Sequence, residues 1–172
     1  MAAALVPITV IAVGIVACVT DVRTRRIPNV LTFGAAGAAL VFRTIIEGWH
    51  GAALAGAGWL TGLAVFLPFF LLRGMGAGDV KLLAALGAWL GPLDAIWLAI
   101  YASLAGGVLA LIVAARHRYL RNAFSNLRNL MQYWWLVGPK PLPELTLEGS
   151  TAPRLAYAIP IFVGTVVTLW LR

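Results

Sequence analysis

Residues 95–115 read AIWLAIYASLAGGVLALIVAA, a run of 21 residues without a charged side chain. A helix needs about 20 predominantly apolar residues to cross the hydrocarbon core of a bilayer. The composition of the whole chain agrees with this run, because 62% of its 172 residues are hydrophobic, 18 more are glycine and only 11% are charged. Soluble domains average about 25% charged residues. The sequence therefore predicts an integral membrane protein.

Five further charge-free runs divide the rest of the chain. They cover residues 2–20, 27–42, 48–72, 82–93 and 155–171. The second run is short, but the guanidinium group of Arg43 can reach the membrane interface and lengthen it. The fourth run is also short and is bounded by Gly91 and Pro92. We predict an all-α polytopic membrane protein of about six transmembrane helices, which form a single membrane-embedded domain over residues 1–172.

The distribution of basic residues predicts the orientation of these helices. With six spans, only Arg43 and Arg172 fall on one side, and eleven basic residues fall on the other. Those eleven are Arg23, Arg25, Arg26, Arg73, Lys81, Arg116, Arg118, Arg121, Arg128, Lys140 and Arg154. Cytoplasmic loops carry an excess of Lys and Arg. We therefore expect the N-terminus outside and the basic loop 116–154 in the cytoplasm; a fourth run that merely dipped into the membrane would destroy this asymmetry.

The loop 116–154 contains an amphipathic pattern. Apolar residues recur at near-helical spacing between arginines over residues 119–135, and Gly138, Pro139, Pro141 and Pro143 follow. This pattern predicts a helix that lies on the cytoplasmic face, just before the last transmembrane helix.

Charge and cysteine content exclude several classes of protein. The net charge of +7 would suggest nucleic acid in a soluble protein, but in a membrane protein it is typical of cytoplasmic loops, so we expect no nucleic-acid partner. The single cysteine, Cys18, allows no internal disulfide and no Cys-x-x-Cys redox pair. No His-Glu-x-x-His metalloprotease motif is present. We expect neither a metal nor another cofactor.

Two acidic residues stand out by their position. Asp21 ends the first predicted span and Asp79 begins the fourth, so both lie at the same membrane face. An ionisable group at this depth is expensive and points to function. Two carboxyl groups from separate helices could share one proton, so that one activates a water while the other donates to a carbonyl. Each aspartate taken alone could instead cap a helix or pair with a nearby basic side chain.

The residues before Asp79 strengthen the catalytic interpretation. Residues 74–79 read GMGAGD, with three glycines in the five positions before the carboxylate. Glycine permits positive φ and the close approach of another backbone. We therefore expect Gly76 and Gly78 to form an active-site loop beside an extended substrate.

These residues carry a resemblance to a known family. The sequence Gly76-Ala77-Gly78-Asp79 resembles the Gly-x-Gly-Asp motif of membrane-embedded aspartic peptidases. The stretch GAGDVKLLAALGAWLGP over residues 76–92, and DVRTRRIPN over 21–29, are similar to segments of type IV prepilin leader peptidases. No N-terminal domain with paired cysteines is present, so the chain most resembles the short, peptidase-only members of tight-adherence (Flp) pilus systems. It differs from them where a Pro-Tyr pair often opens the last helix, since this chain has Ala156-Tyr157.

The resemblance implies a function. It implies an aspartic endopeptidase of the bacterial inner membrane with Asp21 and Asp79 as its catalytic pair. Such an enzyme removes the leader peptide from prepilin and pseudopilin precursors at the cytoplasmic face and works beside the pilus assembly machinery. Its substrates carry a glutamate just beyond the cut, which basic side chains could attract, although anchoring at the membrane explains the same residues. The candidates are Arg23, Arg25, Arg26 and Lys81.

Two other classes of membrane protein remain open. A proton-coupled transporter would also place acids in a helical bundle, although usually near the midplane and in repeated halves. A structural membrane subunit of a pilus or secretion machine would need no glycine-flanked aspartate.

Overall fold

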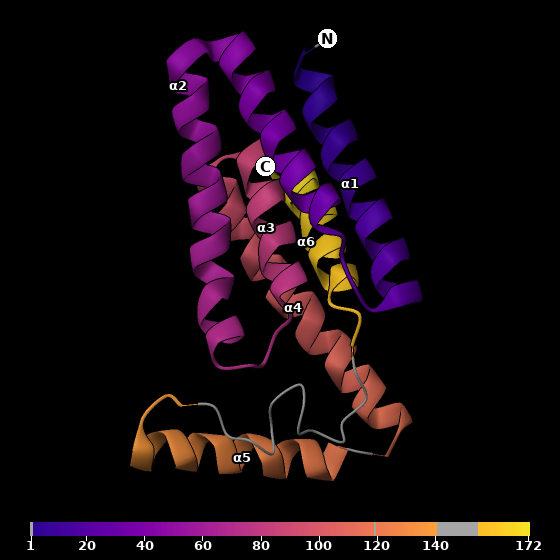
Figure 1. The fold of residues 1–172 in the computed structure, drawn as a ribbon. Coiled ribbons are helices and arrows are strands. Elements are labelled where there is room, and N and C mark those ends of the chain that lie inside the picture. Colours follow the sequence, from indigo (N-terminus) through magenta and orange to yellow (C-terminus); the bar gives the residue numbers. More distant parts are fainter. Residues whose placement is uncertain (1, 119, 141–154) are drawn as a thin grey trace.

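The computed structural model describes residues 2–118, 120–140 and 155–172. Within these ranges the secondary structure is helical, with α1 (Ala2–Thr24), α2 (Asn29–Leu71), α3 (Ala77–Leu90), α4 (Pro92–Arg116), α5 (Leu120–Val137) and α6 (Ala158–Leu171). Figure 1 shows α1, α2, α3, α4 and α6 packed in one bundle, with α5 lying across one end of it. Three helices of the described chain, α1, α2 and α4, are long and apolar enough to cross a membrane. The helical, membrane-protein class is confirmed, and the six-span orientation stays a prediction.

The second and third predicted spans belong to one folded-back element. Helix α2 has 43 residues, more than a single crossing requires, and its backbone leaves the helical region at Gly48 (φ 61, ψ −143). Positive φ favours glycine, which explains why the bend falls there. Figure 1 shows the two limbs of α2 side by side, and we refer to residues 29–47 as the first limb and 49–71 as the second limb.

Helix α3 occupies the centre of the bundle. Its residues from Leu82 to Trp89 are all buried, as expected for a helix that is apolar all round. The second limb of α2 approaches it through glycines, because a Cβ on Gly58 would strike the carbonyl oxygen of Gly87, and one on Gly62 would lie 2.6 Å from that of Leu83. These Gly-x-x-x-Gly positions therefore serve packing inside the bundle.

Helix α3 is short, and its far end is capped by a side chain of α2. Gly91 (φ 94) ends the helix after 14 residues, and Pro92 opens α4. Arg43 in the first limb donates two hydrogen bonds to the carbonyl oxygen of Trp89, from Nη2 at 2.8 Å and Nε at 3.3 Å. Trp89 in turn donates from Nε1 to the carbonyl oxygen of Ala35 at 2.9 Å. These bonds satisfy a helix end that would otherwise lack a partner within the membrane.

Helices α4 and α6 form the other wall of the bundle. Gly164 of α6 packs directly on the backbone of α4, since its Cβ would lie 2.6 Å from the nitrogen of Ala102. At the end of α6, Arg172 pairs with Asp94 of α4 at 3.1 Å. Helix α6 also contacts α1, which brings its first residues beside the last turn of α1.

Helix α5 confirms the predicted helix before the last span. It ends at Val137, directly before Gly138 (φ 89), and none of its described residues is buried. Phe124, Met131 and Trp135 are among its large exposed apolar side chains. The predicted cytoplasmic position of the loop stays a prediction, and residues 141–154, with Pro141 and Pro143, lie outside the described residues.

Candidate active site

Asp21 lies in the last turns of α1, where its side chain contacts the start of α6. The residue is 8% exposed, and its Oδ2 accepts a hydrogen bond from the backbone nitrogen of Ala158 at 3.3 Å. Cys18, one turn earlier in α1, donates from Sγ to the carbonyl oxygen of Ala158 at 3.3 Å. A carboxylate at a helix N-terminus interacts favourably with the helix dipole. Asp21 therefore joins α1 to α6, whatever chemistry it performs.

Asp79 lies in the first turn of α3. Gly76 is the N-cap of this helix, with extended backbone (φ −73, ψ 146), and the backbone nitrogen of Asp79 donates to its carbonyl oxygen at 3.2 Å. The carboxyl group of Asp79 lies beside Gly76, since a Cβ on Gly76 would lie 3.1 Å from Oδ2 of Asp79. An acidic side chain three residues after the N-cap stands at the position of a capping-box residue. The sequence allowed a capping role for each aspartate, and the bond from Ala158 gives Asp21 one.

The two aspartates nevertheless interact with each other. Their carboxyl groups are close enough for an electrostatic interaction, although Asp21 belongs to α1 and Asp79 to α3. Asp79 also interacts with Tyr157, the residue directly before α6. The N-terminus of α6 thus lies beside both acidic groups, with Ala158 on Asp21 and Tyr157 near Asp79.

Tyr157 is held by aromatic and glycine contacts. Its ring packs edge-on against Phe66 of the second limb of α2, with the ring centroids 6.1 Å apart. Phe66 makes a second edge contact with Phe69. On the other side, a Cβ on Gly106 of α4 would lie 2.7 Å from the Tyr157 hydroxyl oxygen, so only glycine leaves room for the ring.

The glycines before Asp79 provide space rather than unusual backbone angles. The described glycines with positive φ are Gly48, Gly91 and Gly138, so neither Gly76 nor Gly78 uses the positive φ that glycine permits. A Cβ on Gly78 would lie 3.2 Å from Cβ of Ile27, and one on Gly76 would lie 3.1 Å from Oδ2 of Asp79. The expected approach of a substrate backbone to these glycines stays a prediction, and within the chain the close neighbour of Gly78 is a side chain. That side chain belongs to Ile27, in the segment that links α1 to α2.

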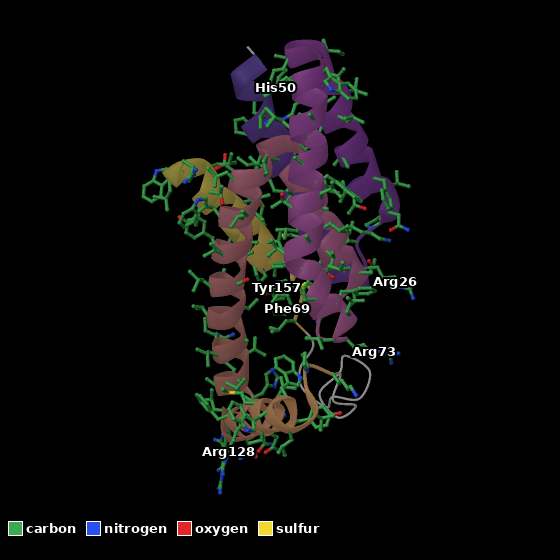
Figure 2. The ribbon with its side chains drawn as sticks, turned by 90° about the vertical axis from the view of Figure 1, so that its left-hand side faces the viewer. Arg26, His50, Phe69, Arg73, Arg128 and Tyr157 are labelled. Carbon is green, nitrogen blue, oxygen red and sulfur yellow. The ribbon has the colours of Figure 1, made fainter. Side chains whose placement is uncertain are left out.

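The basic candidates differ in their surroundings. Arg23, Arg25 and Arg26 are exposed around the end of α1, whereas Lys81 is partly buried and donates from Nζ to Oδ1 of Asn29 at 3.0 Å. Figure 2 shows Arg26, Arg73 and Tyr157 toward one end of the bundle and His50 at the opposite end. Arg26 and Arg73 therefore lie toward the end of the bundle that holds Tyr157, and the common membrane face of the basic residues and the two aspartates stays a prediction.

Two contributors to the site were not predicted as site residues. Tyr157 entered the sequence argument only as half of an altered Pro-Tyr pair, and Ile27 only as part of a motif. Tyr157 lies at the start of the last helix, far from both aspartates in the sequence. No local sequence pattern indicates that this helix start and its aromatic contacts lie beside an aspartate.

Comparison with known proteins assigns this arrangement to a family. Residues 8–111 match the model of the type IV leader peptidase family, a range that holds both aspartates and both glycines. A relative from Dickeya chrysanthemi, "Prepilin leader peptidase/N-methyltransferase", is 38% identical over 104 residues, which are 57% of this chain and 37% of the relative. The chain thus matches little more than a third of the length of this curated relative, and no solved structure matches. With its matched range covering most of the bundle, the chain belongs to the type IV leader peptidase family.

Proposed function

We propose that this protein is a membrane aspartic endopeptidase that removes the leader peptide from type IV prepilins, with Flp-type prepilins as its substrates. The observation that carries the proposal is the electrostatic interaction between Asp21 and Asp79, which come from separate helices. The family match and the printed name of the relative supply the substrate class. If the two aspartates served only as helix caps, they would not need to lie near each other.

The proposed chemistry uses two carboxyl groups that share one proton. The ionised group takes a proton from a water, whose oxygen attacks the carbonyl carbon of the scissile peptide bond. The protonated group donates its proton to the carbonyl oxygen, which gives a neutral tetrahedral intermediate. When the carbon–nitrogen bond breaks, the proton taken from the water passes to the leaving nitrogen. At the same time one hydroxyl group of the intermediate returns its proton to the other carboxylate, as the carbonyl group of the new carboxylic acid forms. The pair ends with one proton, as it began.

The proposed location is the inner membrane of a bacterium, with the active site at the cytoplasmic face. The basic residues near Asp21 and Asp79 support this orientation, because positive residues concentrate on the cytoplasmic side. Arg23, Arg25 and Arg26 are exposed next to Asp21, where they could attract an acidic group of the substrate. Membrane anchoring would use the same three side chains.

The decisive experiment is co-expression with candidate prepilins, followed by the intact mass of the pilin. The wild-type enzyme should lower that mass by the mass of the leader. Asp79→Asn should leave the precursor uncut, because an amide cannot transfer the proton.

Asp94→Asn is the matched control. Asp94 is also an aspartate near the start of a helix, but it lies at the other end of α3 and pairs with Arg172. This variant should still cut the precursor. Near-normal cleavage by Asp79→Asn in folded protein would refute the two-aspartate mechanism, and cleavage of no prepilin by the wild type would refute the assigned substrate.

A further inference from the structure

A hollow separates the two limbs of α2 beside α3. Its volume is about 310 Å³, and a second space of about 170 Å³ shares Phe33 and Trp59 with it and is also lined by Lys81. We call the two spaces together the α2–α3 groove. Its walls include Phe33, Gly37 and Leu40 of the first limb, Gly56 and Trp59 of the second limb, and Ala88 of α3.

Two glycines keep this groove open without serving helix packing. A Cβ on Gly37 or on Gly56 would meet no atom within 4 Å, whereas Gly58, one turn from the groove, has its position taken by the backbone of Gly87. Glycine inside a helix costs about 0.5–1 kcal/mol relative to alanine. At Gly58 close packing offsets this cost. Gly37 and Gly56 gain no contact within the chain, and their missing side chains leave space in the groove for a ligand.

The shape of the groove favours a flexible chain. The groove is open at its side, since Phe33 is 53% and Leu40 46% exposed, and its walls are apolar. A lipid acyl chain fits such a space.

Lys81 adds a cation at the end of the groove near Asp79. Its Nζ lies 5.4 Å from the centre of the Phe33 ring and donates to Asn29. An ammonium group has three donors, so Asn29 uses only one of them. Within residues 2–118, 120–140 and 155–172, no carboxylate forms an ion pair with Lys81. An apolar channel that ends at a cation near the membrane boundary matches an acyl chain with an anionic phosphate.

We propose that the α2–α3 groove binds one anionic phospholipid, whose acyl chain lies along Gly37 and Gly56 and whose phosphate contacts Nζ of Lys81. This site is separate from the carboxyl groups of Asp21 and Asp79 and does not depend on the function proposed above. It assigns Lys81 to a lipid rather than to the substrate.

Native mass spectrometry of the whole protein tests the site. The purified protein is mixed with equal amounts of phosphatidylglycerol and phosphatidylcholine that carry the same acyl chains, and the bound lipid is counted. A lysine near a membrane surface adds about 1 kcal/mol of attraction to anionic lipid, which corresponds to about a fivefold preference for phosphatidylglycerol. Lys81→Met should reduce this preference to about one, whereas Lys81→Arg and the charge control Lys140→Met should keep it.

A second pair of variants tests the apolar part. Gly56→Leu fills the groove and should lower the binding of both lipids, while Gly107→Leu, at an open glycine on α4, should leave it unchanged. A phosphatidylglycerol preference that survives Lys81→Met, or lipid binding that survives Gly56→Leu, would overturn the proposal. The proposal would also be overturned if the Gly56→Leu variant no longer bound prepilin but still bound the same amount of lipid. The groove would then hold a substrate helix. A dimer lost with the same variant would assign the groove to a second copy of the chain.

Discussion

Asp21 of α1 accepts a hydrogen bond from the backbone nitrogen of Ala158, 137 positions later in the sequence, at the first residue of α6. The carboxyl group proposed to act on a substrate therefore also fixes the end of the last helix. Substitutions at this position have two effects, one on chemistry and one on stability, and suitable variants separate them.

Asp21→Asn and Asp21→Ala should both abolish processing but should differ in stability. Asparagine keeps an oxygen that can accept from Ala158, whereas alanine removes the cap, which typically costs about 1 kcal/mol. Thermal unfolding in detergent measures the difference, and the intact mass of the pilin measures processing. If Asp21→Asn cut prepilin at a near-normal rate, Asp21 would be a cap and nothing more.

Gly78→Ala should lower the rate of cleavage more than it lowers the amount of folded protein. The new methyl group would press on Ile27 from 3.2 Å and push the start of α3 away from the link between α1 and α2. A shift of about 1 Å in a catalytic group can cost roughly a hundredfold in rate. Gly76→Ala should act in the same direction but more mildly. The assay is the processed fraction per unit of folded enzyme in liposomes.

Gly34→Ala is the control for these variants, because a Cβ there meets no atom within 4 Å. It should keep full activity. Full specific activity in Gly78→Ala and Gly76→Ala as well would show that these glycines serve packing alone.

Cleavage should be insensitive to EDTA, to serine-directed reagents and to thiol alkylation, because the proposed mechanism uses only carboxyl groups and water. Cys18→Ala should remain active, since it loses a single bond from Sγ to Ala158 while Asp21 still holds the same residue. Measuring the processed fraction with each reagent tests this. Inhibition by EDTA that added metal reverses would contradict the mechanism.

Single cysteines, introduced by substitution and tested by accessibility labelling, should report the orientation of the bundle. Residues 24–26 and 120–150 should react from the cytoplasm, and residues 48–50 and 92–94 from the opposite side. The bend at Gly48 and the turn at Gly91 lie away from the end that carries Asp21 and Asp79, which is why they are the most informative sites. Reaction of residues 120–150 from the opposite side would overturn the six-span orientation.

The sequence predicted the helices better than the contacts between them. Runs without charge locate helices because their cause, the exclusion of charge from hydrocarbon, acts on each residue separately. Asp21 and Asp79 could be assigned to one end for the same reason. The bond between Asp21 and Ala158, the ring of Tyr157 beside Gly106 and the capping of Trp89 by Arg43 could not, because each depends on how distant segments pack. The charge-free runs placed a boundary between residues 42 and 48, and the structure bends at Gly48, directly after it. The runs could not show that the helix is otherwise continuous across this boundary.

The shortness of α3 has an electrical consequence. Fourteen residues of helix span about 21 Å, against a hydrocarbon core of about 30 Å, while the first limb of α2 continues past Arg43 to the bend at Gly48. Arg43 caps this end of α3, and the pair Asp94–Arg172 follows it in α4, so charged groups that require hydration gather there. If α3 crosses the membrane as the six-span prediction has it, the insulating layer beside it is thinner than the surrounding bilayer. A membrane voltage would then drop over this shorter distance, giving a field along α3 about 1.4 times that in the lipid, with Asp79 at one edge of it.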